Sequence, residues 1–306
     1  KHTKSTAVVG GVAIYLGFFL SVIFLNISLL DVSPMLVACL LLAMIGLLDD
    51  LFQFSSSTRF AAQIIACLVM IYWGGVQLFT LGDLLGNGSI VLGVLAIPLT
   101  IFSTVGVINA FNMIDGMDGL SSSLMLVAFA SLFWIAIGAG RSDQAELLVI
   151  VEMGVFAFFL FNARLGLRVK AAVFLGDSGS MFLGFLLAWF LIKFTQTSDA
   201  IMAPVTALWI IAIPLSDTVG VMLRRIIGGC SPFAADRTHI HHLLQHAGFG
   251  VNQSLICLVL VALIMAGIGV FGDLNGIDSP ILFSGFMLFF SVQFITTTYY
   301  VRKHRL

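Results

Sequence analysis

Carboxylate and amide side chains recur every three residues in the stretch NAFNMIDGMDG; they are Asn109, Asn112, Asp115 and Asp118. Residues three apart on a helical turn share one face, so this spacing predicts a row of oxygen ligands. Gly116 and Gly119 would let the backbone approach a ligand closely. Such oxygens suit a hard cation such as Mg²⁺, which keeps waters and substrate phosphates as its other ligands. The alternative is an ordinary Gly/Asp turn between two helices.

Three more aspartates border apolar runs. Asp49 and Asp50 are adjacent, and two neighbouring carboxylates resist joint ionisation unless a cation lies near them. Asp177, in the stretch FLGDSGS, is expected at a helix N-terminus, where free N–H groups favour phosphate. Asp177 could hold a metal, and Phe174 could stack on a base. The alternatives are a solvated helix end for the pair and an N-cap without a ligand for Asp177.

A basic segment, SPFAADRTHIHHLLQHAGF, covers residues 231–249 and carries Arg237, His239, His241, His242 and His246. The histidine spacing allows a zinc site, but no cysteine completes it and Asp236 is the one carboxylate nearby. We therefore favour arginine and histidine as cationic donors to phosphate oxygens. A solvated loop helix is the alternative.

Asp217 lies within an apolar run, shortly before Arg224 and Arg225. Acids inside membrane segments are usually functional or paired. Asp217 is therefore either part of the site or the ion-pair partner of a nearby arginine.

The elements that must position these residues are membrane helices. The chain is 60% apolar and 9% charged, whereas about 25% of a soluble domain is charged. Ten apolar runs approach the roughly 20 residues that a bilayer-spanning helix needs. They are 8–30, 34–52, 60–79, 89–108, 120–138, 146–163, 178–195, 202–223, 253–272 and 280–301. The sequence thus predicts an all-α, polytopic helical bundle, with residues 1–306 as one transmembrane domain. Because the sequence begins with Lys1 and not with an initiator Met, we expect an N-terminal segment before it.

Lysine and arginine gather on one side of this predicted membrane domain when its loops are numbered alternately. Only Arg141 and Lys193 fall on the other side. Because cytoplasmic loops carry the excess of these residues, the richer side is assigned to the cytoplasm. The aspartates described above all lie on that side, in or beside four segments, 49–59, 109–119, 164–180 and 224–252. A net charge of −1, without a basic cluster interleaved with aromatics, argues against a nucleic-acid partner. One membrane face therefore combines carboxylates, glycine-rich turns and basic side chains, as a diphosphate with Mg²⁺ would require.

These motifs together resemble a known family. DD after an apolar helix, NxxNxxDGxDG, FxGDxGS, PLxDT and HIHH are similar to the polyprenyl-phosphate N-acetylhexosamine-1-phosphate transferases, the MraY/WecA-like membrane enzymes of glycosyltransferase family 4. The resemblance spans essentially the whole chain, and it implies one more helix before Lys1. Residues 207–249 are most similar to members that use UDP-N-acetylglucosamine (UDP-GlcNAc). His-Ile-His-His, in place of three consecutive histidines, argues against a muramyl-pentapeptide substrate.

The resemblance implies a reaction in the bacterial inner membrane. GlcNAc-1-phosphate would move from UDP-GlcNAc to undecaprenyl phosphate, and UMP would be released. The lipid-linked pyrophosphoryl sugar would then initiate a cell-surface polysaccharide. Asp177 resembles the family's Mg²⁺ ligand, with Mn²⁺ as a substitute metal, and Asn112 resembles a second ligand. The catalytic residues implied are Asp49, Asp50, Asp115 and Asp118. The first two would activate the lipid phosphate, and the other two would bind the nucleotide and take part in catalysis.

The substrate-binding residues expected from the motifs are Asn109, Phe174, Asp217, Arg237, His239, His241 and His242. Phe174 matches a uracil-stacking position, and the histidines would contact sugar or phosphate. His2 resembles a basic residue near the amino end of the family pattern. Our mechanistic hypothesis is a single displacement on the β-phosphorus, in which Asp49 orients the lipid phosphate or takes its last proton. A covalent phosphoryl-sugar enzyme is the alternative.

Several alternatives stay open at this stage. The donor could be another UDP-N-acetylhexosamine, carrying FucNAc, QuiNAc or GalNAc, because one epimer can depend on a few loop contacts. An ion-coupled transporter would place its acids near the bilayer midplane, whereas most of these acids lie at helix ends. A scaffold subunit of an export complex would need no such site. The sequence leaves the oligomeric state open, with a homodimer among the alternatives.

Overall fold

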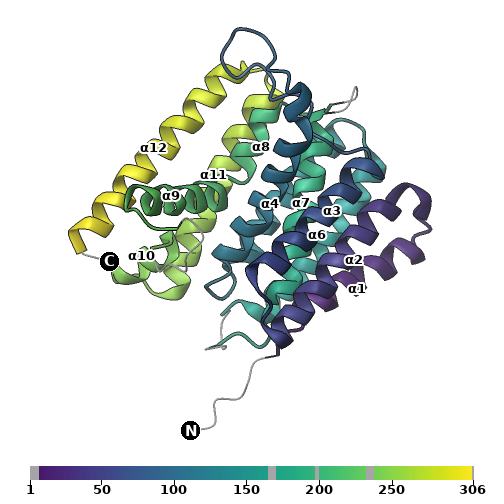
Figure 1. Ribbon diagram of the computed structural model, residues 1–306, viewed down its shortest axis with the longest axis horizontal. Coiled ribbons are helices and arrows are strands. Elements are labelled where there is room, and N and C mark those ends of the chain that lie inside the picture. The colour runs from purple at the N-terminus through teal and green to yellow at the C-terminus, as the bar shows by residue number, and fades with distance from the viewer. Residues whose placement is uncertain (1–6, 165–169, 197–199, 232–237, 305–306) are drawn as a thin grey trace.

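The described chain is a bundle of helices (Figure 1). The computed structural model describes residues 7–164, 170–196, 200–231 and 238–304. Its helices are α1 (Gly10–Phe24), α2 (Leu29–Phe52), α3 (Ser56–Tyr72), the 3₁₀ turn η1 (Gly93–Leu95), α4 (Ala96–Ile114), α5 (Leu120–Gly138), α6 (Ser142–Asn162), α7 (Gly176–Gln196), α8 (Pro204–Ile210), α9 (Ala212–Ile227), α10 (Ile240–His246), α11 (Val251–Leu274) and α12 (Ser279–His304). The prediction of an all-α membrane bundle is confirmed.

Seven helices in the described ranges are long and apolar enough to cross a membrane, and the bent pair α8–α9 makes up to eight. Helices α1 and α3 are apolar but shorter. Each of the ten predicted runs overlaps at least one of these helices, while the number of actual crossings stays a prediction. The run 60–79 extends too far, because α3 ends at Tyr72. Gly75 follows with a left-handed φ of +64°, a conformation that favours glycine and stops the helix.

Helix α7 forms the centre of the bundle. Within its apolar stretch 94% of the residues are buried, against 11% in α12, which lies at the edge (Figure 1). Glycines let neighbouring helices approach its first turn: a Cβ on Gly11 of α1 or Gly46 of α2 would collide with the backbone at Ser178 and Gly179. The sequence therefore fixes the amino end of α7 between two other helices.

The predicted run 202–223 is not one straight helix. It breaks at Ile211, where α8 and α9 meet at 84°, and α9 runs across the direction of its neighbours (Figure 1). Pro214 explains the break, because a proline in a helix interior clashes with the carbonyl four residues earlier, whereas the first turn tolerates it. The bend carries Asp217 to the segment that contains His239.

Candidate active site

The amino end of α7 gathers polar side chains from three helices. The Asp177 Oδ1 atom accepts a 2.6 Å hydrogen bond from Asn112 Nδ2 of α4, which also donates to the Ser180 hydroxyl at 2.9 Å. The Asp177 backbone N–H donates to Asp50 Oδ1 of α2 at 3.0 Å. Asp50 thus accepts one of the N–H groups that a helix start leaves unpaired. Asp177, Asn112 and Asp50 therefore form one connected network at the start of α7.

The backbone before α7 is held against the start of α1. Gly10 and Gly11 donate to the carbonyls of Phe174 and Leu175 at 3.1 and 3.0 Å, and Phe174 donates to Ala7 at 2.9 Å. Gly176 has a φ of +74°, and any side chain there would collide with the Asp50 carboxylate. Gly176, the first glycine in FLGDSGS, is therefore required by its left-handed backbone conformation and by its close contact with Asp50.

Asp49 and Asp50 are adjacent but accept hydrogen bonds from different backbone groups. Asp49 is buried and accepts a 2.6 Å hydrogen bond from the backbone N–H of Phe54, which fixes the turn between α2 and α3. Its other oxygen lies 3.4 Å from Arg59 Nη1, and the same Nη1 lies 3.4 Å from Asp177 Oδ2. Asp49 therefore positions the turn and Arg59, whereas Asp50 positions the start of α7.

The motif NAFNMIDGMDG, which begins in α4 and ends beyond it, is not a continuous helical face. Helix α4 ends at Ile114, and Asp115 is its C-cap, so Asp118 lies in the turn that follows. The predicted row of four is wrong in this respect. Asn109 is also separate from the network around Asp177. Its amide donates to Gln63 Oε1 at 2.9 Å and to the Val105 carbonyl at 2.8 Å.

Asn162 and Arg164 join the site without having been singled out as site residues. Arg164 Nε lies 2.7 Å from Asp118 Oδ2, and Asn162 accepts from the Gly119 N–H at 2.7 Å while donating to the Val173 carbonyl at 2.8 Å. Asn162 therefore ties the turn after α4 to the segment before α7. The sequence signal that could have identified Asn162 was its position as a polar residue at the end of an apolar run.

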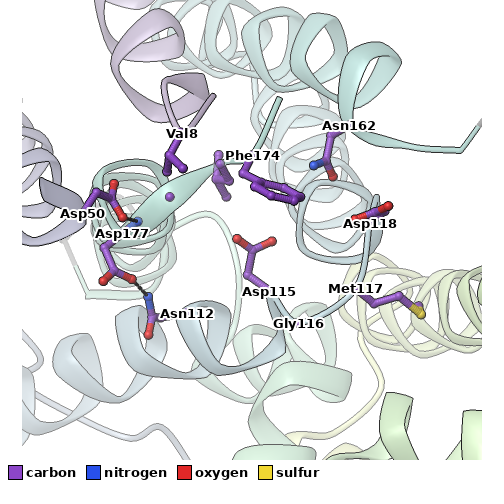
Figure 2. Close-up of a pocket in the computed structure, with 12 residues that line it drawn as sticks. Val8, Asp50, Asn112, Asp115, Gly116, Met117, Asp118, Asn162, Phe174 and Asp177 are labelled. Carbon is purple, nitrogen blue, oxygen red and sulfur yellow. Dashed lines mark hydrogen bonds between the residues drawn. The ribbon is translucent and has the colours of Figure 1, made fainter. Parts of the chain in front are cut away.

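Two adjoining pockets meet at Asp50 and Asp177. The first has a volume of about 430 Å³. Its lining residues are Val8, Asp50, Asn112, Asp115, Gly116, Met117, Asp118, Asn162, Phe174, Leu175, Gly176 and Asp177. Figure 2 shows the Asp115 carboxylate pointing toward the Phe174 ring, with Asp50 and Asp177 on one side and Asp118 on the other. The second pocket, of about 320 Å³, is lined by Asp49, Asp50, Gln53, Phe54, Arg59 and Asp177.

The first pocket has an excess of negative charge. Burial raises the pKa of Asp115 well above its usual value, and the charges of Asp177, Asp118 and Asp50 raise it further. A cation among these carboxylates would offset that repulsion. No three histidine, cysteine or acidic side chains of the described ranges converge as a metal site by themselves. Mg²⁺ commonly takes one or two carboxylates and completes its shell with phosphates and water, so Asp177 and its neighbours fit it.

The histidine segment is organised by Asp217. This carboxylate is 3% exposed, lies 2.8 Å from His239 Nδ1, and accepts the Ile240 N–H at 2.9 Å. Asp217 thus holds the first turn of α10 from the neighbouring helix α9. The expected arginine partner is replaced by His239, since Arg224 donates to Thr297 and to the Thr238 carbonyl.

His241 reaches the turn after α4. Its ring is 1% exposed, and a Cβ on Gly116 would come within 2.6 Å of its Nε2 atom. Burial, with a smaller effect of His242, lowers the pKa of His241 to about 4. His241 is therefore neutral near pH 7, so it does not match the cationic donor that the sequence predicted. The zinc alternative finds no support among the described residues. His2 and Arg237 lie outside the described residues.

Comparison with known proteins identifies the family. The model of the family described as Glycosyl transferase family 4 matches residues 32–195, more than half of the chain. The chain belongs to this family. The match extends from α2 to the end of α7, so it contains Asp49, Asp50, Asp115, Asp118 and Asp177, whereas the histidine segment lies beyond it. Family membership makes the chain a transferase, of the phosphoglycosyltransferase kind.

Curated relatives cover most of the chain. An Escherichia coli K12 protein is 38% identical over 274 residues, which are 89% of this chain and 74% of the relative. A Yersinia pestis relative is 36% identical over 95% of this chain and 80% of its own length. A Haemophilus influenzae relative is 34% identical, over 98% and 84%. All three are named undecaprenyl-phosphate alpha-N-acetylglucosaminyl 1-phosphate transferase.

Proposed function

We propose that this membrane protein transfers N-acetylglucosamine-1-phosphate from UDP-GlcNAc to undecaprenyl phosphate and releases UMP. The product is a lipid-linked pyrophosphoryl sugar that initiates a cell-surface polysaccharide, such as an O-antigen or a common antigen. The names of the relatives support the two substrates. The observation that carries the proposal is the meeting of two pockets at Asp177 and Asp50, since the reaction must bring two phosphate groups together.

The first pocket suits the nucleotide sugar. The Phe174 ring is 41% exposed and lines this pocket, where a uracil base can stack on it. Asp177 and Asn112 would hold Mg²⁺, or Mn²⁺ in its place. When bound there, the metal would neutralise the diphosphate and the charge that develops on the departing UMP. Asp50 and Asn112 keep the Asp177 carboxylate in position through hydrogen bonds to its backbone and side chain.

The second pocket suits the phosphate of the acceptor lipid. Its lining includes the Arg59 guanidinium, a donor that pairs well with phosphate oxygens. An acceptor oxygen would attack the β-phosphorus, and the bond between that phosphorus and the UMP oxygen would break. Undecaprenyl phosphate is already an anion near neutral pH, so placement and charge neutralisation would supply most of the rate.

The decisive experiment measures UMP release by the purified full-length protein in detergent. UDP-GlcNAc, Mg²⁺ and undecaprenyl phosphate are supplied together and then each is omitted in turn. The proposal expects release only when all three are present. UMP release with UDP-FucNAc, UDP-QuiNAc or UDP-GalNAc instead would mean that the donor is a different sugar nucleotide, while the type of reaction stays as proposed. No release with any donor, from protein that unfolds cooperatively, would contradict the proposal.

We further propose that the site faces the cytoplasm from the bacterial inner membrane, because lysine and arginine concentrate on that side. Cys230, exposed beyond α9, should react with a membrane-impermeant thiol reagent only after the cells are permeabilised. A Ser89→Cys, Cys230→Ser variant carries its new thiol on an exposed residue between α3 and α4, and should react in intact cells. The reverse labelling pattern would overturn this orientation.

A further inference from the structure

Arg59 contacts two of the acidic residues at the junction of the pockets. It lies in the first turns of α3, its side chain is 32% exposed, and its Nη1 atom is 3.4 Å from both Asp49 Oδ2 and Asp177 Oδ2. The guanidinium therefore supplies positive charge to Asp177 at the position where the proposed reaction needs a divalent cation.

The two oxygens of Asp177 have different neighbours. Oδ1 accepts the short hydrogen bond from Asn112, whereas Oδ2 faces Arg59. A cation that binds Asp177 through Oδ2 would come close to the guanidinium, and two positive charges at such a separation repel each other. Cation binding and the Arg59–Asp177 contact therefore oppose each other.

The second pocket offers space into which the Arg59 side chain can rotate. Arg59 lines this pocket, which has a volume of about 320 Å³ and also contains Gln53 and Phe54. The backbone that carries it is fixed, because Ser55 caps α3 by accepting the Thr58 N–H, and Asp49 accepts the Phe54 N–H. Rotation about side-chain bonds is thus enough to move the guanidinium from Asp177 into this pocket.

We propose that Arg59 exchanges partners during the reaction: it pairs with Asp177 in the free protein and, when the divalent cation takes Asp177, turns to the phosphate of the acceptor lipid. This inference rests on the proposed function for the identity of the acceptor. Because a freed guanidinium binds phosphate better than one held by Asp177, the cation and the acceptor raise each other's affinity. Such coupling is reciprocal by thermodynamic necessity.

The exchange distinguishes Arg59 from Arg164. Both arginines pair with an aspartate of the first pocket, but Arg164 contacts Asp118, which is not the proposed metal ligand. Replacing either arginine by a neutral residue makes the surroundings of the first pocket more negative by one charge. Only the loss of Arg59 removes a competitor from Asp177, so Arg164→Gln is the matched control for the general electrostatic effect.

The test measures Mn²⁺ binding to the full-length protein by electron paramagnetic resonance, with and without undecaprenyl phosphate. Without lipid, Arg59→Gln should tighten Mn²⁺ binding about fivefold, as expected for loss of a partly exposed ion pair. Arg164→Gln should change it by less than about twofold, because more distant charges are screened. Lipid should tighten Mn²⁺ binding several-fold in the wild type and in Arg164→Gln. Arg59→Gln should lose most of this gain, and Arg59→Lys should retain part of it.

Equal effects of Arg59→Gln and Arg164→Gln on lipid-free Mn²⁺ binding would overturn the exchange, as would weaker binding in Arg59→Gln. An undiminished lipid effect in Arg59→Gln would also contradict it, because direct coordination by the lipid phosphate would then suffice. None of these measurements requires turnover. A failure of the exchange can therefore be told apart from a failure of the proposed reaction, which would appear as absent UMP release in the wild type.

Discussion

The amino end of α7 and the α9–α10 region both gather polar residues, yet the carboxylate charges of the two regions are compensated in different ways. Around Asp177, several carboxylates converge on one pocket, where burial and the mutual repulsion of the carboxylates raise the pKa of Asp115. Around Asp217, the carboxylate is buried and accepts hydrogen bonds from its own protein, at His239 and Ile240. The first region is left with charge for a ligand to neutralise, whereas the second uses its charge to hold a helix in place.

The difference shows how similar sequence patterns lead to different roles. Both regions have a Gly- or Pro-containing motif with an aspartate. The first opens into a pocket that includes Asp177, whereas Asp217 is buried. Asp217 contributes through His239 and the start of α10, and His241 then packs against Gly116 of the first region. We therefore describe Asp217 as a positioning residue for the turn that carries Asp115.

The largest effect among the supporting residues is expected at Asp50. Asp50→Ala removes the acceptor for the Asp177 and Ser178 N–H groups and lets the start of α7 shift. A shift of about 1 Å at a reacting group can cost roughly 100-fold in rate, which is the loss of UMP release that we expect. Asp31→Ala, at the other end of α2, is the control. Near-normal turnover in Asp50→Ala would remove Asp50 from this role.

A comparable effect on stability is expected at His241. Its pKa is lowered from 6.5 to about 4, so the unfolded chain binds a proton more readily than the folded protein in this range. Stability should therefore decrease as the pH falls from 6.5 to about 4, by up to about 3 kcal/mol. His241→Gln should show a flatter profile over this window. Identical profiles in urea unfolding of both proteins would contradict the assignment.

Phe174→Ala should affect donor binding more than the chemical step. Base–aromatic stacking contributes about 1–3 kcal/mol, so KM for UDP-GlcNAc should rise roughly tenfold. We expect kcat to stay within about twofold, and Phe174→Tyr to restore KM. A loss confined to kcat, with KM unchanged, would mean that the ring does not bind the donor.

The smallest effect concerns Asp115 in protein without divalent cations. Its raised pKa means that ionisation costs folding free energy, so stability should decrease as the pH rises above the usual 3.8. Asp115→Asn should therefore unfold at a higher temperature than the wild type in EDTA at pH 8. Mg²⁺ should reduce the difference. A less stable variant in EDTA would contradict the proposed excess of negative charge.

Local patterns predicted much of this site, and long-range contacts account for part of what they missed. Apolar runs located the helices, and FLGDSGS placed Asp177 at a helix start, because both depend on neighbouring residues. The end of α4 at Ile114 was missed, because the three-residue spacing of the motif continues past it. The bend at Ile211 was missed although Pro214 is a local signal for it. The roles of Asp49, Asp50 and Asn162 were also hidden. The bond from Asp177 to Asp50, for example, spans 127 residues and cannot be read from spacing.

The most direct test of the central claim compares Asp177→Asn with Asp217→Asn in one UMP-release assay at saturating substrates and Mg²⁺. Asp177→Asn should lose at least about 1,000-fold in rate, because it removes charge from the proposed metal ligand. Asp217→Asn, which acts through hydrogen-bonded partners, should lose only about tenfold. That order would place the reaction at the amino end of α7. A larger loss in Asp217→Asn than in Asp177→Asn would contradict the account.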